Sequence, residues 1–176
     1  LARGNEYSGE EYRYWEEADP EGLNTYFKND NLQIEGLDLS DDEKEKRNQK
    51  RRVIRYFKWW KAEKYGNSQN DNEVPPSIAL TLLVCSYFQH SKIDGEYNDL
   101  DSLYKTANNI ISTIFYDGLS DDGRIVKKVN ECNLPKTPYS DCLSNMRASE
   151  NYVKRFYDRL EYLRNQLKLA VDESDE

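Results

Sequence analysis

Three cations that share one face of a predicted helix are the first candidate for chemistry in this sequence. Arg51, Arg55 and Lys58 stand at positions i, i+4 and i+7. At 100° per residue they fall within one stripe, with the large apolar residues on the opposite side. Neighbouring cations repel one another unless an anionic group faces them. The stripe therefore fits a phosphate group or protein carboxylates, and the alternative is a solvated helix face without a ligand.

A serine at the start of an apolar segment is the second candidate. Pro75, Pro76 and Ser77 precede the apolar run 78–88. A hydroxyl beside the free N–H groups of a helix N-terminus forms a small anion site. The alternative is that Ser77 only caps its own helix. If Lys58 and Ser77 converge across the polar loop that joins their helices, together they could bind one triphosphate.

The other chemically active residue types form no recognisable site. His90 is the only histidine and has no second histidine or paired carboxylate at a diagnostic spacing, which argues against a general-base role. The acidic clusters in 38–42 and 117–122 match no calcium-loop pattern. The cysteines are Cys85, Cys132 and Cys142. They show neither paired CxxC spacing nor an even count, so their pattern excludes a zinc site.

The composition indicates one folded, acidic domain. The 176 residues include 14 Tyr, 5 Phe and 3 Trp, which supply large apolar bodies for a core. A net charge of -8 argues against a broad grip on duplex DNA. The longest apolar run, 78–85, is much shorter than the ~20 residues that cross a bilayer. The cysteine usage fits a reducing cytoplasm. Because the chain starts with Leu1 and its one methionine is Met146, we expect a fragment or a processed piece.

Helices must position the candidate residues, because apolar residues recur at helical spacing through most of the chain. Ser40 and Glu43 form a capping box that opens the longest helix, and Asp19 precedes a proline suited to a first helical position. A polar loop is predicted at 66–73, and a long connection at 117–140 includes a short extended piece at 124–129. The predicted helices cover residues 20–29, 41–65, 78–88, 99–115 and 149–171.

These patterns predict an all-α fold, a bundle of about five helices with a short irregular N-terminal segment. We expect three regions along the chain. A connecting segment with a short helix occupies residues 1–39, the helical domain occupies 40–171, and an acidic tail occupies 172–176.

Several segments, taken in order, also resemble a known family. The first carries Trp15, the triplet 18–20 (Ala-Asp-Pro) and the aromatic pair 26–27. The helix RRVIRYFKWWKAEKY is followed by PPSIALTLLVCSYF, then by NDLDSLYKTANNIISTIF and NLPKTPYSDCLSNM. This succession resembles the C-terminal, PAP/OAS-like substrate-binding half of the cGAS/DncV-like nucleotidyltransferases, the CD-NTase family.

The resemblance implies a function for the two candidate residues. Lys58 and Ser77 match the helix lysine and helix-start serine that contact the donor triphosphate in the family, and Arg55 and Arg51 of the stripe extend the expected nucleotide-binding set. The whole enzyme would join NTPs into a cyclic di- or trinucleotide second messenger for anti-phage defence.

Further expectations follow from the same resemblance. The family's Gly-Ser loop and the carboxylates that bind Mg²⁺ would lie upstream of residue 1, so this chain alone is expected to be inactive. The implied partners are NTP substrates, the upstream nucleotidyltransferase lobe and regulators from a defence operon, in the cytoplasm and without a membrane.

Two alternatives stay open. In one, the chain is a non-catalytic helical interaction module whose basic stripe binds an acidic protein partner and whose many aromatic residues form an interface. In the other, it belongs to a different nucleotidyltransferase of the same superfold, such as a polymerase acting on RNA ends. The acidic charge and the few basic clusters disfavour a long RNA groove.

Overall fold

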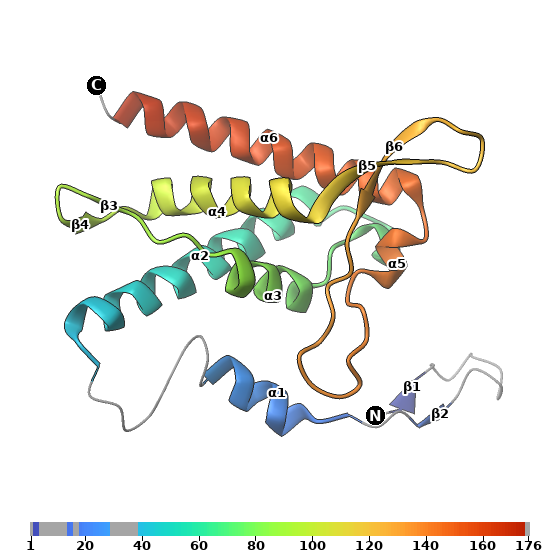
Figure 1. The fold of residues 1–176 in the computed structure, drawn as a ribbon, viewed down its shortest axis with the longest axis horizontal. Coiled ribbons are helices and arrows are strands. Elements are labelled where there is room, and N and C mark those ends of the chain that lie inside the picture. The colour runs from blue at the N-terminus through green and yellow to red at the C-terminus, as the bar shows by residue number, and fades with distance from the viewer. Residues whose placement is uncertain (1, 4–13, 16–17, 29–38, 175–176) are drawn as a thin grey trace.

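The computed structural model describes residues 2–3, 14–15, 18–28 and 39–174 (Figure 1). Much of the predicted connecting segment (4–13, 16–17 and 29–38) and residues 175–176 of the predicted tail lie outside the described residues. The described α-helices are α1 (Pro20–Tyr26), α2 (Asp41–Tyr65), α3 (Ser77–Tyr87), α4 (Asp99–Ile114), α5 (Ser144–Arg147) and α6 (Glu150–Ser174). A short 3-10 helix, η3 (Asp71–Glu73), lies in the predicted polar loop.

The mainly helical prediction is confirmed, but the all-α prediction is wrong in detail. The described residues include three two-stranded antiparallel sheets. Their strands are β1 (Ala2–Arg3) with β2 (Tyr14–Trp15), β3 (Lys92–Ile93) with β4 (Glu96–Tyr97), and β5 (Phe115–Leu119) with β6 (Ile125–Val129).

The β5–β6 hairpin accounts for most of this difference. β6 coincides with the extended piece predicted at 124–129, whereas its partner strand β5 was expected to be helix end and connection. Aromatic and β-branched residues favour both strands. The turn between them is closed by hydrogen bonds between Ser120 and Arg124, and Gly123 adopts a φ of 80° there, a conformation that glycine adopts without a steric penalty.

The long helix α2 begins where its sequence predicts. The Ser40 hydroxyl accepts a hydrogen bond from the Glu43 N–H, and the Glu43 carboxylate accepts one from the Ser40 N–H. The capping box is therefore formed. At its other end α2 stops at Tyr65, just before Gly66, as predicted.

The core lies between α2, α3, α4 and α6, which pack against one another in the arrangement shown in Figure 1. The short helix α3 is apolar on nearly all sides and buries six consecutive residues, 79–84. α6 lies along α4, and the hairpin packs against the N-terminal part of α6. The most deeply buried large apolar side chains are Phe57, Phe156, Leu80, Ile110 and Leu160.

The predicted boundary between the last helix and the acidic tail is displaced. We expected the helix to end near residue 171, but α6 continues to Ser174. Lys168 Nζ lies 2.8 Å from a carboxylate oxygen of Asp172, an i,i+4 ion pair that supports the last turn. The first residues of the predicted tail are therefore helical.

Candidate functional site: a lysine and a serine at the start of α3

The hydroxyl of Ser77 receives a hydrogen bond from α2, but from a different lysine than the sequence predicted. Lys61 Nζ donates to Ser77 Oγ at 3.0 Å. Lys61 lies three residues after Lys58, which places it on an adjoining part of the same helix face. The loop 66–76 folds back so that the start of α3 meets the last turns of α2. The structure therefore joins Ser77 to Lys61 of α2, and not to Lys58, the lysine that the sequence analysis paired with it.

Ser77 does not cap its own helix. Pro76 occupies the N-cap position, Ser77 is the first helical residue, and α3 has no side-chain cap. The first helical hydrogen bond runs from the Leu80 N–H to the Pro76 carbonyl oxygen. The interpretation of Ser77 as a capping residue is therefore wrong, because a residue inside the first turn directs its hydroxyl away from the N–H groups that a cap would bind. Its exposed hydroxyl can contact a ligand.

The electrostatics of this position are those of a site for an anion. Burial lowers the pKa of Lys61, and the nearby positive charge of Lys58 lowers it further. Within the described residues, neither lysine forms an ion pair with a carboxylate. The positive end of the α3 dipole adds to the field of the two ammonium groups. Lys58, Lys61, Ser77 and the first turn of α3 are called the Lys61–Ser77 site below.

The two arginines of the predicted stripe lie on the same helix, farther from the start of α3. Arg55 is exposed and precedes Lys58 by about one turn, and Arg51 lies one turn earlier and is half-buried. The arginine between them has another role. Arg52 forms a bidentate pair with Asp99, at 2.6 and 3.0 Å, and a 2.8 Å bond with Glu45, so that it fastens α2 to the start of α4.

Lys61 is the functional candidate that the sequence analysis missed. It stands at i+3 from Lys58, a spacing that extends the predicted stripe by one position. The spacing alone could not select it, because the rotation of α2 relative to α3 decides which lysine reaches the serine. That rotation is set by buried residues such as Phe57 and Trp60.

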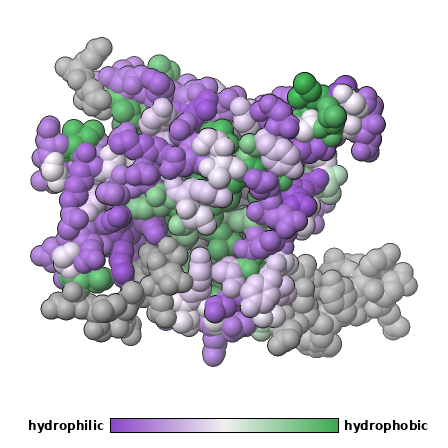
Figure 2. All heavy atoms as spheres, in the orientation of Figure 1, coloured by the Kyte–Doolittle hydropathy of each residue, from purple (hydrophilic) through white to green (hydrophobic). Residues whose placement is uncertain are grey.

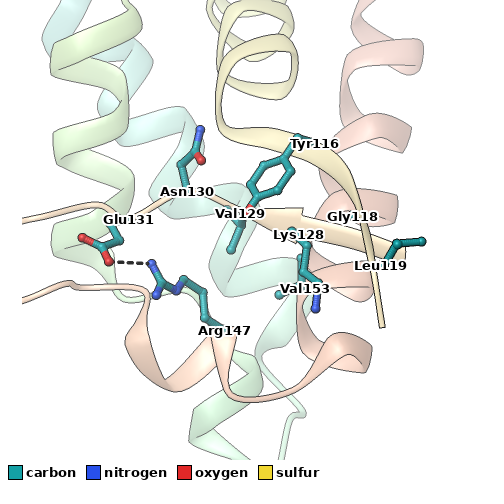
Figure 3. Close-up of a pocket in the computed structure, with 9 residues that line it drawn as sticks. All are labelled: Tyr116, Gly118, Leu119, Lys128, Val129, Asn130, Glu131, Arg147 and Val153. Atoms are coloured by element: carbon teal, nitrogen blue, oxygen red, sulfur yellow. Dashed lines mark ion pairs between the residues drawn. The ribbon is translucent and has the colours of Figure 1, made fainter. Parts of the chain in front are cut away.

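A hollow lies elsewhere, under the β5–β6 hairpin (Figure 3). It measures about 670 Å³ and is lined by residues of the hairpin, the segment after it, α5 and α6. Its cations already face carboxylates: Arg147 lies 3.2 Å from Glu131, and Lys128 lies 3.6 Å from Glu150. None of the residues predicted to bind nucleotide lines it. For an anionic ligand, the Lys61–Ser77 site is therefore the stronger candidate.

The part of the chain that the structure describes holds neither a candidate metal site nor a membrane-spanning helix. No group of three or more His, Cys, Asp or Glu side chains in this part of the chain could hold a metal ion. No helix there is both long and apolar enough to cross a membrane.

Comparisons with known proteins return no match for this chain among family models, curated proteins or solved structures.

Proposed function

We propose that this chain is the triphosphate-binding helical lobe of a CD-NTase-type nucleotidyltransferase, in which Lys61 and Ser77 bind the donor triphosphate. The observation that carries the proposal is the 3.0 Å contact between Lys61 Nζ and Ser77 Oγ at the start of α3. Lys61 takes the place that the family resemblance gave to Lys58, which becomes a second, more peripheral cation of the same site.

The three kinds of donor at this position suit a phosphate group. An ammonium group supplies charge-assisted hydrogen bonds, a hydroxyl supplies a neutral one, and the first N–H groups of α3 point out of the helix end. Partial burial of Lys61 strengthens its interaction with an anion, because water screens a half-buried charge less than an exposed one. A triphosphate also relieves the repulsion between Lys58 and Lys61.

The remaining chemistry would come from outside this chain. In the proposed enzyme, carboxylates of a nucleotidyltransferase lobe hold Mg²⁺ and activate the attacking hydroxyl. The product would be a cyclic di- or trinucleotide used in anti-phage defence. These parts of the proposal rest on the family resemblance, whereas the triphosphate site also rests on the geometry of the described residues.

Titration with ATP tests the proposed site directly. A hydrogen bond to a charged group is worth about 1.5–3 kcal/mol, so Lys61→Ala should weaken ATP binding by roughly 10- to 150-fold. Lys58→Ala should weaken it less, because Lys58 acts through its charge and does not contact Ser77. Lys154→Ala is the matched control, since this exposed lysine of α6 pairs with Asp158 and should leave ATP affinity unchanged. Equal affinities for the native chain and Lys61→Ala would contradict the proposal.

One observation favours the interaction module as a second candidate. Trp59 lies beside the basic stripe on α2 with 66% of its surface exposed, and tryptophan and arginine are both enriched at protein interfaces. If the module interpretation is right, an oligoglutamate peptide should bind and quench Trp59 fluorescence, whereas ATP should not bind. If the nucleotide site is right, Trp59→Ala should leave ATP affinity unchanged.

A further inference from the structure

Two of the three cysteines lie opposite each other on a short antiparallel ladder that the sequence did not reveal. After β6 the chain runs through Cys132, turns, and returns past Cys142. Cys142 N–H donates to the Cys132 carbonyl at 2.9 Å, and Leu134 N–H donates to the Ser140 carbonyl at 3.0 Å. Asn133 and Asp141 form the bridge between these two hydrogen bonds. The register therefore pairs Cys132 with Cys142.

This pairing brings the two residues within reach of a covalent bond. Residues joined across an antiparallel ladder by such a backbone hydrogen bond have Cα atoms about 5.5 Å apart. Disulfides form over Cα separations of about 4.4–6.8 Å. The backbone thus already has the spacing that a disulfide requires.

Both side chains also lie on the same side of the ladder, toward the body of the protein. Cys132 belongs to the buried core, with its Sγ 3.9 Å from the carbonyl oxygen of Ala79 in the first turns of α3. Cys142 is half-buried and packs against the same core. Burial raises the pKa of the Cys132 thiol to about 12, and the nearby Cys142 contributes to that rise, which places the two thiols within electrostatic range.

The third cysteine is separated from this pair. Cys85 lies near the other end of α3, six residues after Ala79 and therefore about 9 Å farther along the helix axis. The charges that act on it are those of Lys50 and Lys58 on α2. The structure therefore places Cys132 and Cys142 together and Cys85 apart from them.

We propose that Cys132 and Cys142 are a disulfide-forming pair that oxidised glutathione converts to an intramolecular bond. The half-buried Cys142 thiolate attacks one sulfur of glutathione disulfide, forming a mixed disulfide and releasing one glutathione. The Cys132 thiolate then attacks Cys142 Sγ and releases the second glutathione. Two protein thiols are oxidised and one glutathione disulfide is reduced to two thiols, so electrons and protons balance.

The rate of this oxidation should depend steeply on pH. Desolvation by burial is the main cause that raises the pKa of both thiols. For Cys142, the negative charge of Asp141 raises the pKa further. Only the thiolate attacks a disulfide, and below the thiol pKa its fraction rises about tenfold per pH unit. In a compartment where glutathione is mostly reduced, the two thiols stay reduced. The bond would form there only when the fraction of oxidised glutathione rises.

Mass spectrometry of the 176-residue chain tests the proposal. After prolonged incubation with oxidised glutathione at about pH 8.5, where the thiolate fraction is larger than at neutral pH, the mass should fall by two hydrogen atoms. The proteolytic map should link Cys132 to Cys142. Cys85→Ser is the matched control and should form the same bond, whereas Cys142→Ser should not. A bond that includes Cys85, or two thiols that stay reduced after prolonged oxidation, would overturn the proposal.

The midpoint of thermal unfolding, the Tm, gives a second readout. The specific bond should raise the Tm, whereas random oxidation should not. A bond that fits the native backbone and closes the short segment 133–141 should raise the Tm by roughly 5–10 °C. Addition of a reductant should reverse the rise. A Tm that stays constant or falls on formation of the Cys132–Cys142 bond would show that the native geometry does not accept it.

Discussion

At the scale of single residues, two serines near helix starts have different roles that their sequence contexts do not distinguish. Ser40 is an N-cap and exchanges hydrogen bonds with Glu43. Ser77 lies one position further into its helix, caps nothing, and contacts Lys61 instead. The difference arises because Pro76 takes the N-cap position of α3, so that a one-residue shift changes the role of the hydroxyl.

Alanine substitution at the two serines should separate stability from binding. Ser40→Ala should lower the free energy of unfolding by about 1 kcal/mol, because it removes a helix cap. Ser77→Ala should change that free energy by less than about 0.5 kcal/mol, as expected for an exposed residue that caps nothing, but it should weaken ATP binding. Urea denaturation and ATP titration measure the two effects. A larger loss of stability in Ser77→Ala than in Ser40→Ala would contradict these roles.

The sequence predicted the kinds of residue in the candidate site better than their identities. The spacing of Arg51, Arg55 and Lys58 indicated a cationic face, and the position of Ser77 indicated an anion site at the next helix. The choice of Lys61 over Lys58 depends on how α2 and α3 pack, which is a long-range property. The pairing of Cys132 with Cys142 was missed for the same reason, because it depends on the register of an irregular loop.

At the scale of elements, local signals predicted the helices well and the strands poorly. Capping and apolar periodicity located α2, α4 and α6 to within a few residues. The strand β5 follows α4 without a turn residue between them, so the change from helical to extended backbone at Phe115 has no local marker. Its pairing with β6 and its packing on α6 decide the change.

One face of α6 should carry most of its contribution to stability. Phe156 is fully buried, and its ring meets that of Phe115 edge-on with centroids 5.3 Å apart. Phe156→Ala should lower the free energy of unfolding by about 3–5 kcal/mol. Leu169→Ala on the same helix is the control, because Leu169 is 56% exposed and its loss should cost less than about 0.5 kcal/mol. Similar losses for the two variants in urea denaturation would contradict the described packing.

The hairpin extends from this packed region as a separate feature. Leu119 and Ile125 are cross-strand partners at its end and are 67% and 77% exposed. Figure 2 shows apolar atoms gathered at the protruding end of the hairpin. The pair lies away from the Lys61–Ser77 site, so its replacement by serine should leave ATP binding unchanged.

At the scale of the whole molecule, acidic side chains that accept hydrogen bonds should set the pH dependence of stability. Neighbouring side chains lower the pKa of several carboxyls through hydrogen bonds: Asp42 with Lys92 and Tyr97, Glu43 with Ser40, Glu73 with Ser68, and Glu131 with Asn133. The folded chain therefore binds fewer protons than the unfolded chain in mildly acidic solution.

The sign of this effect follows from the lowered pKa values. The stabilisation is fully present above the ordinary values of 3.8 for Asp and 4.5 for Glu, and it is lost as the pH falls through the lower values of the folded state. We expect the Tm to fall between about pH 5 and pH 2, with a smaller change at high salt because Asp42, Glu43 and Glu131 are exposed. A Tm that is constant or that rises on acidification would contradict the prediction.

The mapping of ATP onto the chain by amide NMR tests the central claim most directly. With the native chain and ATP in the absence of metal, the Lys61–Ser77 site predicts the largest shift changes at the N–H groups of residues 77–79 and at the Lys61 side chain. Lys61→Ala should reduce these changes, and Lys154→Ala should not. The largest changes at Lys128 and Arg147 in the hollow under the hairpin, or no changes at saturating ATP, would contradict the account.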